Sequence, residues 1–219
     1  MNNVECSSRQ LEGLVIQRAP QRIIDLFCCA GGASMGLHKA FPNAEITGVD
    51  IEVHANYPFH FKQADALEFP LPGYDFIWAS PPCQHYSSMA NIHKNREKHP
   101  ALIEPIRKRL KESGAVWVIE NVMGAPLKNP TMLCGTMFGL KIPKHRIFET
   151  SAPIFNLLPP CQHQDVYDPY HGGEEARGER EKLAKVIGVD WAMTRPEVRE
   201  AIPPAYSEYL IKTLWGASV

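Results

Sequence analysis

The sequence lacks three features that would place the protein in a membrane or outside the cell. None of its apolar runs approaches the length needed to span a bilayer. Residues 1–21 contain no basic head, continuous apolar block or cleavage site, so we expect no secretory signal. The six cysteines form no disulfide framework and are expected to be reduced thiols. We therefore expect a cytoplasmic protein whose residues 1–21 lead into the fold.

An excess of charge of one sign is also lacking. The formal net charge is −1, so bulk electrostatics predicts no nucleic-acid partner, and any such site must depend on local charge. Metal-ligand spacing is weak as well, because Cys161, His163 and His171 match no strong zinc pattern. From the sequence we expect no bound metal and infer no obligatory protein partner.

Short apolar runs alternate with helical stretches along the first half of the chain. The runs are at 22–27, 44–50, just before Asp65, at 74–80 and at 115–122. A helix beginning near Ile103 is expected, because Pro105 suits only a first turn. This alternation predicts an α/β fold with an open, doubly wound parallel sheet.

The second half is less regular. After residue 123 the pattern indicates a loop, a short helix and a final strand. Proline, glycine and charge dominate from 151 to 201, and residues 168–182 are typical of exposed loop. A closing helix is expected in residues 202–219.

Several polar residues follow the predicted strands, where ligands of such sheets collect. Gly31 and Gly32 come after the first strand and would let the backbone approach an anionic group, although a plain tight turn explains them equally well. Asp50 is spaced to accept hydrogen bonds from ribose hydroxyls, and Asp65 could accept one from an adenine amine. Together these residues indicate an adenosine-containing cofactor.

A cysteine lies in a stiff frame in the stretch "ASPPCQHYSS". Pro81 and Pro82 restrict the backbone before Cys83, which suits a nucleophile that must meet an electrophilic carbon. The alternative is a small buried apolar residue. Glu120 ends an apolar strand, where desolvation should raise its pKa and make it an acid near neutral pH, unless it is a structural carboxylate.

Cations follow this cysteine. Lys94 and Arg96 are candidates for phosphate contacts, whereas a solvated helix face explains Arg107, Lys108 and Arg109.

The ordered motifs resemble a known family. "DLFCCAGGASMGL", "GVDIE", "QADALEF", "SPPCQHYSS", "ENV" and "KHRIFE" are similar to successive motifs of the DNA (cytosine-5) methyltransferases, in particular the compact bacteriophage-encoded members, which also suggests a restriction–modification context. The resemblance covers about residues 22–212. It implies a Rossmann-like, S-adenosylmethionine-dependent methyltransferase sheet, with double-stranded DNA as partner.

The resemblance also implies roles for individual residues. Cys83 would attack carbon 6 of a flipped cytosine, Glu120 would hold ring nitrogen 3 and the exocyclic amine, and Arg146 would contact the ring carbonyl. The expected cofactor contacts are Phe27, Ala30, Gly31, Gly32, Asp50, Ile51, Asp65, Ala66, Pro82, Ala205 and Tyr206. The expected DNA contacts are Gln84, Ser87, Lys94, Arg96, Asn121 and Lys144.

The family also implies a division of the chain. Residues 22–150 would be the catalytic and cofactor-binding core, 151–201 a very small target-recognition region, and 202–219 a helix returning to the core. The small region would read only about two to four base pairs.

Three positions differ from the family pattern. Cys29 stands where a glycine is usual, Lys144 replaces the first arginine of an Arg-x-Arg pair, and "IPPAYSEYL" replaces a Gly-Asn-x-Val motif.

Other functions stay open at this point. Cytosine methylation of RNA or of a free deoxycytidine nucleotide would use the same chemistry. A catalytically silent DNA-binding protein would not need Cys83, Glu120 and Arg146 together. A nicotinamide-dependent oxidoreductase would share the glycine turn and strand-end acid but gives no reason for "PPCQ" or "ENV".

Overall fold

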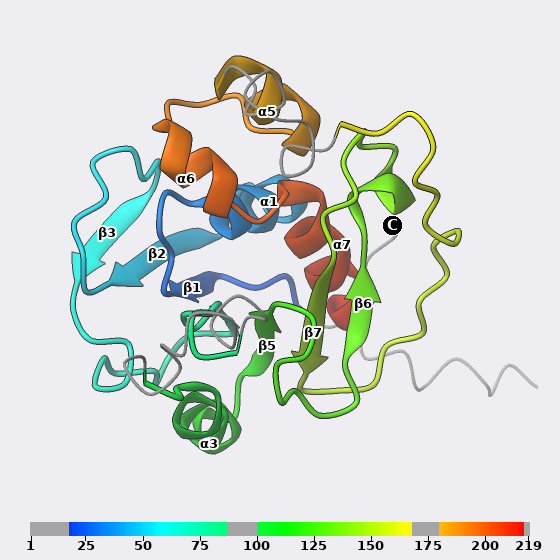
Figure 1. Ribbon diagram of the computed structural model, residues 1–219. Helices are drawn as coiled ribbons and strands as arrows, with labels where there is room; N and C mark the ends of the chain where they lie inside the picture. Colours follow the sequence, from blue (N-terminus) through cyan, green and yellow to red (C-terminus); the bar gives the residue numbers. More distant parts are fainter. Residues whose placement is uncertain (1–17, 87–99, 168–179, 217–219) are drawn as a thin grey trace, which may run out of the picture.

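A computed structural model describes residues 18–86, 100–167 and 180–216 of the chain (Figure 1). Within these ranges, no helix is both long enough and apolar enough to cross a membrane. Of the expected DNA contacts, Ser87, Lys94 and Arg96 lie outside the described residues, as does His171.

Seven strands form one sheet in the described part of the chain. Its order is β3-β2-β1-β4-β5-β7-β6. The strands are β1 (Arg22–Leu26), β2 (Glu45–Asp50), β3 (His60–Gln63), β4 (Phe76–Ala79), β5 (Val116–Asn121), β6 (Thr131–Leu133) and β7 (Arg146–Thr150). All of them lie between residues 22 and 150, the segment expected to form the core.

The α/β fold predicted from the sequence is confirmed, with one correction to the sheet. Strands β1 to β5 pair in parallel, as expected. Strand β7 is antiparallel to both β5 and β6, so the sheet is mixed. The connection from β5 to β7 runs through β6 and a short 3-10 helix, η2 (Gly135–Phe138), and includes no crossover helix of the kind that makes neighbouring strands parallel.

Helices cover both faces of the sheet (Figure 1). Helices α1 (Gly32–Ala40) and α7 (Pro204–Trp215) pack on one face, and α3 (Ile103–Ser113) on the other. Strand β4 shows the reason, because its side chains alternate. Phe76 and Trp78 join the core under α7, whereas Ile77 and Ala79 join the core under α3. All four are fully buried.

Helix α3 begins at Ile103 as predicted, but of the three basic residues expected on a solvated face only Lys108 is exposed. Arg107 is 2% exposed and donates from Nε and Nη2 to Glu149 of β7, with the Nη2 bond at 2.8 Å. Arg109 donates to the carbonyls of Ala66 and Phe69. These guanidinium groups tie α3 to β7 and to the loop after β3, so their role is structural.

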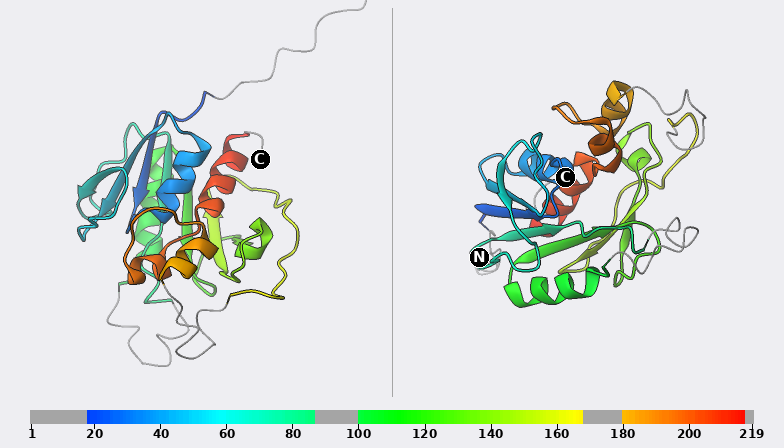
Figure 2. Two further views of the ribbon diagram at one scale, coloured as in Figure 1. Left: turned by 90° about the horizontal axis from the view of Figure 1, so that it is seen from above. Right: turned by 60° about the vertical axis from the view of Figure 1, so that its left-hand side comes forward.

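The segment from 151 to 201 contains more structure than its composition predicts. Helices α5 (Arg180–Ile187) and α6 (Arg195–Glu200) lie near each other at one end of the molecule (Figure 2). A small apolar cluster that includes Leu183, Ile187 and Val198 packs against Ala30, beside the glycine turn. The expectation of loop was wrong for these helices because each is short and lies in a segment dominated by proline, glycine and charge.

Candidate active site

A large cavity gathers the carboxyl ends of β1, β2, β4 and β5. Its volume is about 1160 Å³, somewhat above the usual range for small-molecule pockets, which leaves room for a nucleoside cofactor and a second ring. Of the residues predicted from the sequence, it is lined by Phe27, Ala30, Gly32, Asp50, Ile51, Asp65, Ala66, Pro82, Cys83, Gln84, Glu120 and Arg146. The structure therefore brings most of the expected catalytic and cofactor residues to one place.

The turn after β1 is tightly wound. Phe27, Cys29 and Gly31 all have positive φ angles, of 61°, 44° and 87°. Gly31 caps α1, and a Cβ there would lie 2.8 Å from Pro58 Cδ, so both its φ and its surroundings require glycine. Cys29, at the position where the family usually has glycine, adopts the left-handed region at a cost in strain.

The second glycine has a different role from the one expected. Gly32 lines the cavity, but a Cβ on it would approach the Ile202 carbonyl oxygen to 2.5 Å. Gly36, one turn later, is similarly close to the Pro204 carbonyl oxygen. These glycines let α1 pack closely against the start of α7, which delivers Ala201 and Ile202 to the cavity.

Asp50 lines one side of the cavity, at the end of β2. Its Oδ2 accepts from the Cys29 amide at 3.1 Å, and its Oδ1 accepts from the Glu52 amide at 3.1 Å. His54 Nε2 lies 3.4 Å from Oδ2. Asp65 accepts from the Leu67 amide at 2.8 Å and is exposed at the cavity edge. These bonds fix the two carboxylates and leave further acceptor capacity toward the cavity.

Asp25 also lines the cavity, although the sequence did not single it out. It is 1% exposed; its Oδ2 accepts from Ser34 Oγ at 2.5 Å, while its Oδ1 has no hydrogen-bond partner among the described residues. Burial raises the pKa of Asp25 to about 7. A buried acceptor without a partner at a cavity wall suits a ligand that carries an amine or ammonium group.

Cys83 lies directly after β4 at the cavity wall and is half-buried. Burial raises the pKa of its thiol, the negative charge of Glu120 raises it further, and Arg146 opposes both effects. The thiol is thus protonated at rest, and a ligand that masks Glu120 would favour the thiolate.

Glu120 and Arg146 form an ion pair across β5 and β7. Arg146 Nε lies 3.1 Å from Glu120 Oε1, with side-chain exposures of 19% and 7%. Burial raises the pKa of Glu120, while Arg146 and a hydrogen bond with Ser80 lower it. Because both side chains line the cavity beside Cys83, a nucleophile, an acid and a planar donor converge there.

Two expected DNA contacts are placed elsewhere. Asn121 is 1% exposed and does not line the cavity; its Nδ2 donates to the Pro81 carbonyl at 2.8 Å, and its Oδ1 accepts from the Val122 amide. Lys144 is 6% exposed and donates to the Arg199 carbonyl at 2.8 Å. Burial lowers the pKa of Lys144 to about 7. Asn121 thus supports the loop before Cys83 and Lys144 supports the C-terminal end of α6, which corrects the expectation that they contact DNA.

The expected cofactor contacts in α7 are also corrected. Tyr206 is fully buried, packs against Phe138 and Phe148, and donates its hydroxyl to the Lys144 carbonyl. Neither Ala205 nor Tyr206 lines the cavity. A helix beginning at Pro204 points its first turn into the core, so the preceding residues face the cavity instead.

Sequence reasoning missed the contribution of α6. Arg195, Pro196, Arg199 and Glu200 line the cavity, and Asn56 Nδ2 donates to Glu197 Oε2 at 2.9 Å, linking α6 to the loop after β2. The sequence does contain a signal for the start of α6. Thr194 and Glu197 form a capping box with proline in the first turn, which is a recognisable start for a helix.

Comparisons with solved structures agree with this fold. A methyltransferase from Entamoeba histolytica, EhMeth, aligns with a TM-score of 0.62 at 10% identity, over 90% of this chain and 98% of that one. An RNA methyltransferase from Salinibacter ruber in complex with S-adenosyl-L-homocysteine aligns with a TM-score of 0.39 at 14% identity, over 63% of this chain and 84% of that one. The first likeness shows the fold, and the second is too weak to support an argument.

Comparisons of sequence are more specific. No curated protein sequence matches the chain significantly. The sequence profile described as C-5 cytosine-specific DNA methylase matches residues 21–131, which hold the glycine turn, Cys83 and Glu120 and make up just over half of the 219 residues. The chain therefore belongs to the C-5 cytosine-specific DNA methylase family.

Proposed function

We propose that the protein is a DNA (cytosine-5) methyltransferase, which transfers a methyl group from S-adenosylmethionine to carbon 5 of a cytosine in DNA. The observation that carries the proposal is the convergence of Cys83 with the Glu120–Arg146 pair in the cavity that also holds Asp50 and Asp65. A thiol alone would be weak support. Its position beside an acid and a guanidinium group, in this family, supports covalent chemistry on a pyrimidine ring.

The cavity fits S-adenosylmethionine. Asp50 and Asp65 would accept from the ribose hydroxyls and the adenine amine, and Phe27 would contact the ring. Asp25 offers its unpartnered carboxylate oxygen to the ammonium group of the cofactor. When bound, the cofactor supplies an electrophilic methyl group.

Cys83 and Glu120 act on the cytosine. The Cys83 thiolate adds to carbon 6, which breaks the 5,6 double bond and increases electron density at carbon 5. Glu120 donates a proton to ring nitrogen 3 and accepts from the exocyclic amine, while Arg146 donates to the ring carbonyl oxygen. After methylation a base such as water removes the carbon 5 proton, the double bond re-forms, and the Cys83 thiolate leaves.

The protonation of Glu120 follows from its surroundings. A buried carboxyl group favours its neutral form, which is the form that donates to nitrogen 3. Arg146 opposes this rise in the pKa of Glu120, because its positive charge, with Nε 3.1 Å from Glu120 Oε1, favours the ionised carboxylate. When a cytosine enters, its carbonyl oxygen would accept a hydrogen bond from the Arg146 guanidinium. Arg146 would then stabilise the Glu120 carboxylate less, and protonation of Glu120 would become easier.

The substrate must leave its stack to reach Cys83. Extrusion of a base from a duplex costs a few kcal/mol, and contacts with the phosphates would offset part of that cost. Gln84, next to Cys83 at the cavity wall, would contact the extruded nucleotide.

Incubation with methyl-labelled cofactor and mixed-sequence duplex DNA tests the proposal. Nucleoside analysis should then give 5-methylcytosine. Label on adenine, or no transfer, would contradict it. RNA and deoxycytidine triphosphate, added as competitors in the same assay, should leave transfer to duplex DNA unchanged; strong competition by either would identify that class as the substrate.

A further inference from the structure

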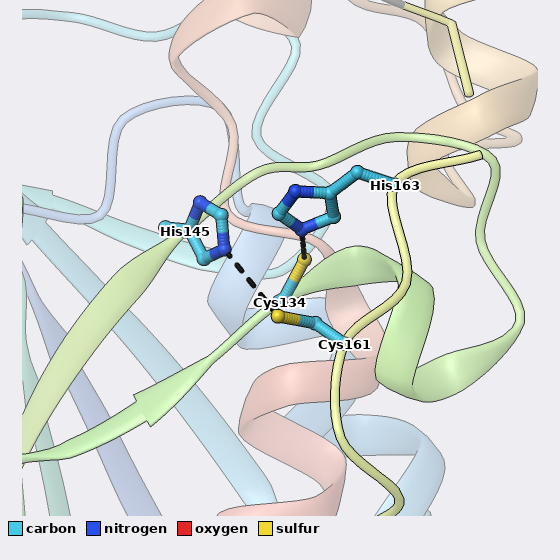
Figure 3. Close-up of side chains that lie close together, drawn as sticks. All are labelled: Cys134, His145, Cys161 and His163. Carbon is cyan, nitrogen blue, oxygen red and sulfur yellow. Dashed lines mark hydrogen bonds between the residues drawn. The ribbon is translucent and has the colours of Figure 1, made fainter. Parts of the chain in front are cut away.

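Four side chains outside the cavity converge on one point (Figure 3). They are Cys134, His145, Cys161 and His163, and their ligand atoms all lie within 4.8 Å of one another. Cys134 Sγ is 3.5 Å from His163 Nε2, and Cys161 Sγ is 3.8 Å from His145 Nε2. The reaction proposed above uses none of these residues. Two thiols and two imidazoles at this spacing form a ligand set of a kind found in structural zinc sites.

The distances suit a tetrahedral ion. With zinc–sulfur bonds of about 2.3 Å and zinc–nitrogen bonds of about 2.0–2.1 Å, neighbouring ligand atoms of a regular tetrahedron lie about 3.3–3.8 Å apart. Both sulfur–nitrogen distances fall within that range. The widest separation, 4.8 Å or less, exceeds that range by no more than about 1 Å, a gap that small side-chain rotations can close.

One half of the cluster is built on the sheet. Leu133 of β6 pairs with Arg146 of β7 in antiparallel register, so Cys134 and His145 are the next residues opposite each other. Cys134 is fully buried and caps η2. The sheet therefore fixes these two ligands before any ion binds.

The other half comes from a segment without regular structure. Residues 151–167 are all described and form no helix or strand. Phe155 and Leu157 are 85% and 90% exposed, so burial holds part of this segment only weakly. Hydrogen bonds connect this segment to η2: the Gln162 amide donates at 3.1 Å to Thr136 Oγ1, which also lies 3.3 Å from Cys134 Sγ. Thr136 is thus positioned to orient a thiolate from outside the ligand set.

We propose that Cys134, His145, Cys161 and His163 bind one zinc ion with a structural role. Two thiolates and two neutral imidazoles neutralise the charge of Zn²⁺, and binding releases the two thiol protons. Four protein ligands close the coordination shell, so the ion takes no part in methyl transfer. The ion fixes His145, the neighbour of Arg146, and fastens the beginning of the 151–201 region to β6 and β7.

The sequence predicted no metal site. It offered Cys161 and His163 with His171, which lies outside the described residues. The real partners are 16 or more residues earlier in the chain, and only the pairing of β6 with β7 brings them together.

Metal analysis of the full chain tests the proposal without reference to activity. Protein expressed with zinc and purified without a metal-affinity step should contain about one zinc per chain by mass spectrometry. Cys134→Ser and His163→Ala should lose it, while His60→Ala and Cys29→Ser, which change a histidine and a cysteine elsewhere, should retain it. Full retention in the ligand variants, or a folded wild-type chain without zinc, would overturn the proposal.

Two further measurements guard against variants that fail to fold. Chelation of the wild-type protein should lower its melting temperature, and added zinc should restore it, since an ion that binds only the folded state stabilises it. Thr136→Val should weaken zinc affinity by about 10–100-fold while leaving the ligands in place. A Cys134–Cys161 disulfide, seen as a loss of two mass units that reductant reverses, would contradict the zinc site.

Discussion

The Asn121 side chain donates to the Pro81 carbonyl at 2.8 Å, so strand β5 holds the loop that carries Cys83. Glu120 and Asn121 are consecutive in β5 and point to opposite sides. Glu120 faces the cavity, and Asn121 fixes the backbone from which Cys83 projects. The stiffness that Pro81 and Pro82 give this loop therefore has a second source outside the motif itself.

Asn121→Ala should weaken both stability and catalysis. Removing the amide leaves the buried Pro81 carbonyl without its donor, at a cost of about 1–3 kcal/mol in the free energy of unfolding. Methyl transfer in a single turnover should slow, whereas cofactor affinity should not change because Asn121 does not line the cavity. Denaturant unfolding and equilibrium dialysis check the two effects. A large loss of cofactor affinity would show that Asn121 acts on the cavity directly.

Arg146→Ala should leave Glu120 buried with its charge uncompensated. We expect a loss of about 3 kcal/mol in unfolding free energy, because one partner of a largely buried ion pair is removed. Adding Glu120→Gln should recover about 1–2 kcal/mol, since the unpaired charge is then gone. Strictly additive losses in the double variant would mean that the pair is not coupled. Glu120→Gln alone should slow methyl transfer by about 10²–10⁴-fold.

Asp25 should make stability depend on pH. Its pKa is about 7 in the folded chain and near the ordinary carboxyl value when unfolded, so the folded state binds the extra proton. Stability is therefore greatest below the unfolded pKa and falls as pH rises through about 7.

Asp25→Asn should remove that dependence. The neutral amide keeps an acceptor for Ser34 Oγ and should raise the unfolding free energy at pH 8 by on the order of 2–4 kcal/mol, with little gain at pH 4. Thermal unfolding across this pH range measures the difference. An equal effect of the substitution at both pH values would show that Asp25 is not protonated in the folded state.

Cys29→Gly should stabilise the fold. Cys29 has a φ of 44°, and the strain of about 1–2 kcal/mol that a side chain incurs there exceeds the unfolded-state entropy that glycine adds. A net gain of about 0.5–1 kcal/mol in unfolding free energy is expected. Cys28→Gly is the control: Cys28 is 4% exposed and not in the left-handed region, so that change should destabilise. A loss of stability in Cys29→Gly would show that the thiol contributes more than the strain costs.

The sequence predicted the fold and the cavity better than it predicted supporting residues. Strand ends are readable from apolar runs, so Asp50, Cys83 and Glu120 could be assigned to one sheet edge. Side-chain direction, which alternates along a strand, decides the rest. The alternation of β5 would have separated Asn121 from Glu120, and the capping box at Thr194 would have revealed α6. Lys144 and Tyr206 depend on contacts between distant segments, which no local pattern encodes.

The zinc ligands illustrate the same limit. Cys134 follows β6 and His145 precedes β7, so they lie at opposite ends of the segment that joins these strands. Their proximity can be predicted only once β6 and β7 are known to pair. Spacing along the chain carried no information about that pairing.

The central claim is that Cys83 forms a covalent bond to carbon 6 of cytosine in DNA. Duplex DNA made with 5-fluorocytosine tests it most directly, because fluorine at carbon 5 cannot leave as a proton does and the adduct is trapped. With S-adenosylmethionine present, intact mass and peptide mapping should find DNA attached at Cys83. Cys83→Ser should give no adduct, and Cys6→Ser should still form one. Methyl transfer to ordinary cytosine without any trapped adduct, or an adduct at another cysteine, would contradict the account.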